Sequence, residues 1–256
     1  MSLSIDLAGR VALVTGGAKG VGAGISAELV AAGANVVTCG RREAEAAPGT
    51  SHVVCDVRDS DAVRSLVDGI VADRGSLDLL VNNAGGSGWG LAAETDHVVH
   101  RKILELNLVA PLLVAQEANR VMQRQERGGA IVGISSVSGV RPSPGTAAYG
   151  AAKAGLDHLT RSLAIEWGPR VRINAIDLGM TRTEALEGFY GGADNLDELE
   201  QTVPGGRLAL PQDVGWLTAF LASPLAAHIS GATIELHGGG EAADFLAEMR
   251  EEQAGP

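Results

Sequence analysis

Features that mark several protein classes are scarce in this chain, and cysteine is the first of them. Only two cysteines occur in 256 residues, which is too few for a disulfide framework or a cysteine zinc site. Both Cys39 and Cys55 lie inside apolar runs that are typical of buried strands. The six histidines show no ligand spacing either, and we expect no bound metal.

Long apolar runs and basic clusters are missing as well. No segment has the roughly 18 uncharged apolar residues that a membrane-spanning helix needs. The first residues also lack a charged region followed by a long apolar stretch, as a secretion signal would have. Because 31 acidic residues outnumber 20 Lys and Arg, the net charge of −11 repels polyphosphates. We therefore expect a cytoplasmic protein with no nucleic-acid or membrane partner.

What the chain does contain is a regular alternation of short β-branched runs and amphipathic stretches. The runs that predict strands are residues 10–14, 34–39, 52–55, 77–81, 130–135, 171–176 and 232–236. The stretches that predict helices are residues 20–32, 60–73, 96–125, 147–167 and 211–222. Most strand candidates are apolar throughout, as expected when helices cover both faces of a parallel sheet. The pattern predicts a three-layer, doubly wound α/β fold around a seven-stranded parallel sheet.

No linker, repeat or low-complexity tract interrupts this alternation, so we expect a single domain over residues 1–256. Residues 183–206 connect the sixth strand to the last helix, and a connection this long predicts a substrate lid or a disordered loop. Residues 42–51 contain Pro48-Gly49, which argues against a long helix there. The acidic tail at 242–256 either extends into solvent or packs on a neighbouring subunit.

Glycines crowd the turn between the first predicted strand and the helix that follows it. The stretch from Thr15 to Gly22 reads Thr-Gly-Gly-Ala-Lys-Gly-Val-Gly. Such a turn lets the backbone approach a pyrophosphate, whose charge is stabilised by free N–H groups at the helix start. The segment Asn82 to Gly85, Asn-Asn-Ala-Gly, follows the fourth strand and should reach the same edge of the sheet. The pattern indicates a dinucleotide site.

Tyr149 and Lys153 lie four positions apart on a predicted helix, so both side chains project from one face. A phenol with a pKa of about 10 is a poor proton shuttle near neutrality. A nearby ammonium favours the phenolate and lowers that pKa. The spacing therefore predicts that Lys153 tunes Tyr149 for proton transfer.

These motifs resemble, in order, those of the short-chain dehydrogenase/reductase family, from about residue 8 to residue 240. The turn matches the family's Thr-Gly-x-x-x-Gly-x-Gly. The resemblance implies a Rossmann fold and hydride transfer between a nicotinamide cofactor and a carbonyl or secondary alcohol, with Tyr149 as general acid/base. It also implies that Ser136 orients the substrate oxygen and that Lys153 holds the nicotinamide ribose. Asn107 would complete the catalytic set by holding a water that connects Lys153 to solvent.

The resemblance also assigns the cofactor contacts, and Asp56 is the residue expected beside the adenine. The expected contacts are Gly16, Ala18, Lys19, Gly20, Val21, Arg41, Asp56, Val57, Asn83, Ala84, Gly85, Tyr149, Lys153, Gly179, Thr181 and Thr183. One position departs from the family pattern, because Leu178 stands where a Pro-Gly pair usually begins the nicotinamide loop. Nicotinamide placement is therefore less firmly predicted than phosphate binding.

The end of the second strand distinguishes NADP from NAD, which differ by the ribose 2′-phosphate. Gly40 stands where NAD-using relatives place an acid, and Arg41 follows at once. Lys19 occupies the turn just before Gly20, and both cations match the pattern of NADP-using relatives. We expect NADP, with NAD as the less favoured cofactor.

Other functions remain open at this level. A catalytically idle dinucleotide-binding module would have a broken Tyr/Lys pair, which is intact here, and an epimerase or dehydratase would need a larger substrate region. The expected partner is a small ketone or alcohol, whose apolar wall we place at Trp89, Phe189 and Tyr190. By resemblance we also expect a homotetramer or homodimer through the helices at 96–125 and 147–167.

Overall fold

A seven-stranded parallel sheet forms the centre of the protein in the computed structural model, which describes residues 4–190 and 193–240. Its strands lie in the order β3-β2-β1-β4-β5-β6-β7, and each pair of neighbours is parallel. The strands are β1 (Val11–Thr15), β2 (Asn35–Gly40), β3 (Thr50–Val54), β4 (Leu79–Asn82), β5 (Gly129–Ile134), β6 (Val171–Leu178) and β7 (Thr233–Leu236). The predicted fold class is confirmed.

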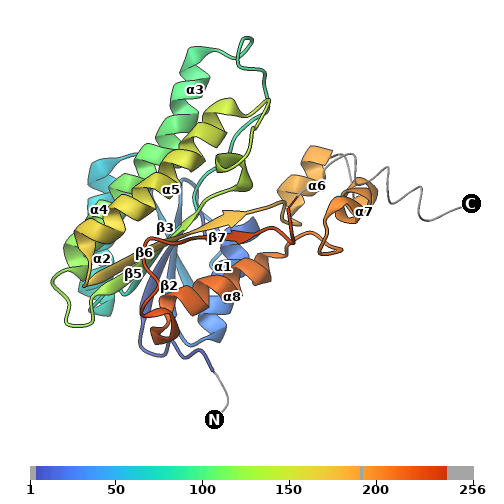
Figure 1. Cartoon of the computed structure of the whole chain (residues 1–256). Helices are drawn as coiled ribbons and strands as arrows, with labels where there is room; N and C mark the ends of the chain where they lie inside the picture. Colours follow the sequence, from blue (N-terminus) through green and yellow to red (C-terminus); the bar gives the residue numbers. More distant parts are fainter. Residues whose placement is uncertain (1–3, 191–192, 241–256) are drawn as a thin grey trace, which may run out of the picture.

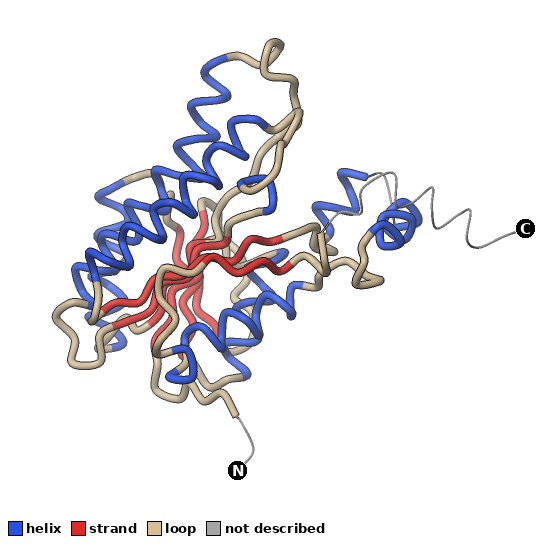
Figure 2. The backbone as a smooth tube through the Cα atoms, in the orientation of Figure 1, coloured by secondary structure: helices blue, strands red, loops and turns tan. Residues whose placement is uncertain are grey.

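Helices cover both faces of this sheet (Figures 1 and 2). One face is covered by α1 (Gly20–Ala31) and α8 (Pro211–Ala222), and the other by α2 (Ser60–Arg74), α4 (Ala110–Met122) and α5 (Ala147–Trp167). Successive strand residues point to opposite faces. Leu13 accordingly packs in the cluster under α2 and α4, while Val14 packs in the cluster under α1 and α8. Two-sided burial explains why the strands are apolar throughout.

The long helix predicted at 96–125 is interrupted in the structure. It consists of α3 (His97–Leu104), a π-helical turn over Glu105–Val109 and then α4. The N–H of Ala110 donates to the carbonyl of Glu105, five residues back. Pro111 follows, and proline has no N–H to bond the carbonyl four residues earlier, so the regular helical pattern cannot continue through this point.

The segment predicted as a lid or disordered loop contains two helices, α6 (Glu184–Tyr190) and α7 (Ala193–Thr202). They lie beyond the sheet, away from the main helical layers (Figure 1). Arg182 connects the chain after β6 to α7 by ion pairs with Asp197 and Glu200. Leu196 packs there in a small apolar cluster of its own, so the segment is ordered by contacts that local composition did not reveal.

The remaining expectations about organisation have mixed outcomes. Residues 43–49 form no helix, as Pro48-Gly49 predicted. The acidic tail at 242–256 lies outside the described residues. Both cysteines are free and buried. In the described part of the chain, no helix is both long and apolar enough to cross a membrane.

The carboxyl ends of the parallel strands meet at one edge of the sheet. The strand order reverses between β1 and β4, since β2 lies on one side of β1 and β4 on the other. In open α/β sheets ligands bind at such a reversal, outside the strand carboxyl ends. The glycine-rich turn after β1 and the Asn-Asn-Ala-Gly segment after β4 therefore flank the expected crevice.

Candidate active site

The turn after β1 has the backbone shape that a dinucleotide phosphate requires. Gly16 and Gly20 have φ values of +65° and +55°, a region that other residues rarely adopt. A Cβ added at Gly22 would lie 2.3 Å from the Gly16 carbonyl oxygen. Helix α1 begins here, and its N-cap residue Lys19 provides no side-chain cap, which leaves N–H groups of the first turn for an anion. This cradle fits a pyrophosphate.

Asn83 fastens this turn to the end of β4. Its Nδ2 donates to the Thr15 carbonyl oxygen at 2.9 Å, and its backbone N–H donates to Thr15 Oγ1 at 3.0 Å. The N–H of Ala84 donates to the same hydroxyl at 3.0 Å. The structure thus brings together the predicted residues of the two motifs, although about 70 positions separate them in the chain.

Asn107 lies in the π-helical turn and is completely buried. Its Nδ2 donates to the carbonyls of Ile103 and Gly86, both at 2.9 Å, and its Oδ1 accepts the Gly86 N–H at 2.9 Å. The amide therefore replaces a helical hydrogen bond to Ile103 and holds the strand-β4 loop. A Cβ at Gly85 would lie 2.7 Å from Asn107 Oδ1 and 3.7 Å from Lys153 Nζ, so both side chains lie beside the same face of this glycine.

Tyr149, Lys153 and Ser136 come together where α5 passes the end of β5. The hydroxyl of Ser136, the residue before the short 3₁₀ turn at Val137–Gly139, lies close enough to the Tyr149 side chain to lower its pKa. The Lys153 Nζ lies 5.4 Å from the centre of the Tyr149 ring and donates to the Ile134 carbonyl at 2.7 Å. The backbone N–H of the neighbouring Ser138 donates to Ser136 Oγ at 3.2 Å.

The pKa values of this group depart from the sequence-based expectation. Burial raises the pKa of Tyr149, and the Ser136 hydroxyl opposes that shift. We expected Lys153 to lower the pKa of the phenol, but no hydrogen bond joins Lys153 to the Tyr149 hydroxyl, and Nζ lies over the ring instead. Burial lowers the pKa of Lys153 to about 8, opposed by Asp157 and Asp177.

The two cations predicted to select NADP lie at the surface of this edge. Lys19 and Arg41 are exposed, and neither side chain has an ion-pair or hydrogen-bond partner among the described residues. Asp56 accepts a bidentate pair from Arg58, at 2.9 and 2.6 Å. This Arg58 hydrogen bond lowers the pKa of Asp56 to about 2, with a smaller contribution from Arg41. Sequence reasoning missed Arg58, although the Asp-x-Arg spacing was its signal.

Three further predicted contacts have different environments. The side chain of Val57 is buried in the core under α2, so only its backbone remains for a ligand. Val21 is partly buried and packs against the core on the other face, and Ala18 is exposed at the turn. Side-chain contacts to the cofactor are therefore not available from Val57.

Comparison with known proteins gives consistent relatives. The family model described as enoyl-(acyl carrier protein) reductase matches residues 16–241. A 3-oxoacyl-[acyl-carrier-protein] reductase FabG from Rickettsia prowazekii is 31% identical over 239 residues, covering 92% of this chain and 98% of the relative. Tropinone reductase-like 3 from Erythroxylum coca is 36% identical over 177 residues, which is 69% of this chain and 67% of the relative.

A solved structure of similar fold supports the same relationship. The aldohexose dehydrogenase of Thermoplasma acidophilum has a TM-score of 0.87 at 30% identity, over 93% of this chain and 96% of the other. The chain belongs to the short-chain dehydrogenase/reductase family. It is accordingly an NAD(P)-dependent oxidoreductase, and the alternative of a catalytically idle module is set aside.

The loop after β6 of this short-chain dehydrogenase/reductase continues the sheet where the family pattern has Pro. Leu178 is buried and pairs with Leu236, and the Gly179 N–H donates to the Leu236 carbonyl at 3.0 Å. Thr181 Oγ1 donates to the Gly179 carbonyl at 3.2 Å. A Cβ at Gly20 would lie 3.8 Å from a methyl carbon of Thr183. Of these predicted residues, Thr183 reaches the glycine-rich turn.

Trp89 lies beside the loop that leads into the Tyr149 helix. The Gly90 N–H donates to the Gly145 carbonyl at 2.8 Å, and a Cβ at Gly145 would lie 2.1 Å from the Trp89 indole nitrogen. The indole is 64% exposed, so it can still contact a ligand. The side chains of Phe189 and Tyr190, with which we expected it to form an apolar wall, lie outside the described residues.

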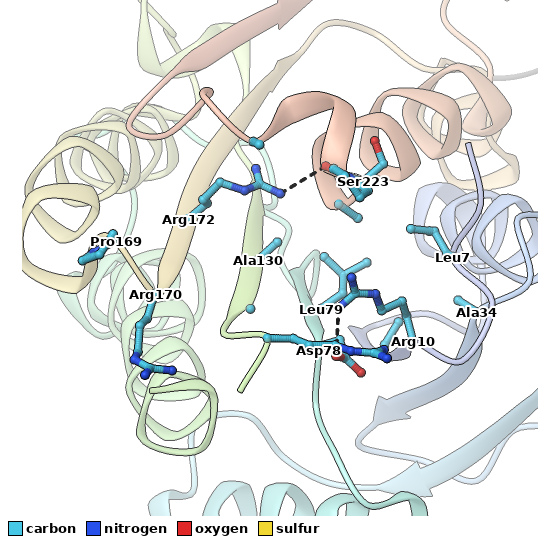
Figure 3. Close-up of a pocket in the computed structure, with 16 residues that line it drawn as sticks. Leu7, Arg10, Ala34, Asp78, Leu79, Ala130, Pro169, Arg170, Arg172 and Ser223 are labelled. Carbon is cyan, nitrogen blue, oxygen red and sulfur yellow. Dashed lines mark hydrogen bonds and ion pairs between the residues drawn. The ribbon is translucent and has the colours of Figure 1, made fainter. Parts of the chain in front are cut away.

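A cavity of about 300 Å³ lies at the opposite edge of the sheet (Figure 3). Figure 3 shows Arg10 turned to Asp78, with which it pairs at 3.3 Å, and Arg172 turned to Ser223. Arg172 also donates to the Leu221 carbonyl at 2.8 Å. These arginines stabilise strand starts and a helix end, and the site of the short-chain dehydrogenase/reductase chemistry is at the other edge.

Proposed function

We propose that the protein is an NADP(H)-dependent oxidoreductase that interconverts a carbonyl and a secondary alcohol, with Tyr149 as general acid/base. The observation that carries the proposal is the grouping of Tyr149 with the nearby Ser136 hydroxyl and with the buried Lys153, whose Nζ lies 5.4 Å from the centre of the ring. Two hydroxyl groups then face the position of one substrate oxygen, and a positive charge lies close by.

In the direction of reduction, the Tyr149 hydroxyl donates its proton to the substrate oxygen as that oxygen becomes negative. The Ser136 hydroxyl donates a hydrogen bond to the same oxygen and orients it. The phenolate left on Tyr149 is stabilised by the nearby Lys153 ammonium. Asn107 holds the Gly86 loop beside Lys153 by its three hydrogen bonds. The nicotinamide cofactor supplies or accepts the hydride.

The cofactor is held by the residues named above. N–H groups from Ala18 to Val21 bind the pyrophosphate, and Asp56 contacts the adenine while Arg58 holds its carboxylate. Lys153 binds the nicotinamide ribose, and residues 179–183 bind the carboxamide end. We assign the 2′-phosphate of NADP to Lys19 and Arg41, because both are exposed cations without ion partners in the described chain, and Gly40 presents no competing acid.

The substrate class follows from what the relatives share. A 3-oxoacyl reductase, a tropinone reductase-like protein and an aldohexose dehydrogenase differ widely in ligand. The proposed reaction is therefore limited to the interconversion of a carbonyl and an alcohol.

Residues 183–206 act as the lid of a single cytoplasmic domain. Exposed Ile165 and Val109, 86% and 56% accessible on α5 and the π-helical turn, support a homotetramer or homodimer through these helices.

A direct test is a panel of ketones and secondary alcohols with NADPH and NADH, followed by cofactor absorbance. The Tyr149→Phe variant is the matched control, because it removes the proton donor and keeps the ring. We expect turnover with the wild type and less than a tenth of it in the variant, with cofactor binding retained. Equal turnover in the two proteins would remove Tyr149 from the mechanism, and a preference for NADH would remove the NADP assignment.

A further inference from the structure

Two buried carboxyl groups lie behind Lys153, and the reaction described above does not use them. Asp157 follows Lys153 by one helical turn on the same face of α5, and Asp177 is the penultimate residue of β6. Their residues are only 5% and 1% exposed. Each carboxyl group lies close enough to the other and to the Ser135 hydroxyl for both to influence its pKa.

When both of these neighbouring groups are ionised, they repel one another. An ionised carboxyl group is only an acceptor, and the Oδ1 atoms of Asp157 and Asp177 are both buried without a donor among the described residues. Ser135 has a single hydroxyl hydrogen, and it also faces the Lys153 carbonyl at 3.3 Å. A proton on one carboxyl group turns the acceptor pair into a donor and an acceptor. The pair must therefore titrate as a unit.

Burial and the neighbouring Asp157 raise the pKa of Asp177 to about 6, and burial also raises the pKa of Asp157. Other charged groups act on the pair from two directions. Arg161 on α5 lowers the pKa of Asp157, and Glu235 on β7 raises the pKa of Asp177. The charge of the pair thus changes from −1 to −2 as the pH passes about 6.

Lys153 is the positive group that this charge faces. Its residue is 4% exposed, and the Ile134 carbonyl is its hydrogen-bond acceptor. Burial opposes the ammonium form, while Asp157 and Asp177 favour it. An ammonium ion taken out of water requires such compensation, because burial otherwise drives it to the neutral form.

We propose that Asp157 and Asp177 form a buried carboxyl pair that keeps Lys153 in its ammonium form at neutral pH, and are thus positioning residues for Tyr149. The role in turnover rests on the proposed function, whereas the effect on Lys153 does not. Neither aspartate touches the reacting atoms, and both act through Lys153.

The chain allows this effect to be measured directly, since it contains only three lysines, Lys19, Lys102 and Lys153. Lysine labelled at Cε gives three NMR signals, which Lys19→Arg and Lys102→Arg assign by elimination. In the wild type we expect the Lys153 signal to titrate near pH 8. In Asp157→Asn and Asp177→Asn it should titrate about one pH unit lower, because each variant removes an attractive charge.

The matched control is Asp78→Asn, which removes a buried carboxyl group at the opposite edge of the sheet (Figure 3). It should leave the Lys153 titration unchanged, even if it destabilises the fold. A Lys153 titration that coincides in the wild type and both pair variants would overturn the proposal. So would an equal shift in Asp78→Asn, because the effect would then come from general destabilisation.

The pH profile of carbonyl reduction provides the second readout. The alkaline limb of kcat/KM should move to lower pH in Asp157→Asn and Asp177→Asn, by the same interval as the NMR titration. A profile that stays in place while the NMR titration moves would reject the role in catalysis. If the wild type reduces no carbonyl compound with either cofactor, the proposed function fails, and the NMR titration still decides the role of the pair.

Discussion

The Lys153 ammonium nitrogen lies 5.4 Å from the centre of the Tyr149 ring and donates its hydrogen bond to the Ile134 carbonyl at 2.7 Å. The lysine is thus fixed to strand β5 on one side and packed against the phenol on the other. This arrangement holds a positive charge close to Tyr149.

Replacing Lys153 should lower turnover and cofactor affinity but raise the free energy of unfolding at neutral pH. We expect Lys153→Met to lose turnover and to bind the cofactor more weakly, because the ribose contact and the charge are both removed. Burial holds the folded pKa near 8, against 10.5 for a free lysine. Protonation of this lysine therefore costs about 3 kcal/mol of folding stability at neutral pH. The cost is absent above pH 10.5 and is complete once the pH has fallen through 8.

The measurement is denaturant unfolding of both proteins between pH 7 and pH 10. Relative to Lys153→Met, the wild type should become more stable as the pH rises across this range. The exposed Lys102 supplies the control, since Lys102→Met should show no such trend. A purely kinetic defect in Lys153→Met, with normal cofactor affinity, would argue against the ribose contact.

Arg41→Ala should change the cofactor preference. A charge-assisted hydrogen bond contributes roughly 1.5–3 kcal/mol, so its loss should raise the KM for NADP about tenfold to a hundredfold. The KM for NAD should change little, because NAD lacks the 2′-phosphate. Steady-state kinetics with both cofactors test this. Arg42→Ala is the neighbouring control, and an equal effect there would point to general electrostatic attraction.

Asn107→Ala should destabilise the fold as well as the site. The change removes three hydrogen bonds that the completely buried Asn107 side chain makes with the Gly86 N–H and with the carbonyls of Gly86 and Ile103. Each hydrogen bond contributes roughly 0.5–1.5 kcal/mol net, so the loss of three should lower the free energy of unfolding by about 2 kcal/mol or more. Asn35→Ala, at an exposed asparagine bonded to Arg74, should cost well under that amount. Similar losses in the two variants would contradict the assigned role.

Trp89→Ala should act on the substrate and leave the cofactor unaffected. The exposed indole lies against Gly145, four residues before Tyr149. We expect a higher KM for apolar carbonyl substrates with an unchanged KM for NADP. Trp216→Ala is the control, because this tryptophan is also exposed and donates to Glu28 between α8 and α1. If both variants behave alike, Trp89 is not part of the substrate wall.

The periodicity and motifs of the chain alone determined the seven parallel strands, the glycine-rich turn and the spacing of Tyr149 and Lys153, because these are local features. The π-helical turn at Asn107 had a local signal in Pro111, but its partner Gly86 could not be read from the helix itself. Likewise, residues 183–206 were recognised as unusual by length, and their two helices were not predicted.

Only the tertiary structure determined which charged groups surround Lys153 and Tyr149. The approach of Asp177 to Asp157 joins strand β6 to helix α5, and neither residue stood out in the sequence. The sign of the pKa shift at Tyr149 also came from the fold, because it depends on how much water the surrounding elements exclude. Spacing along a helix determines which side chains share a face, whereas burial and facing charges depend on segments that are distant in the sequence.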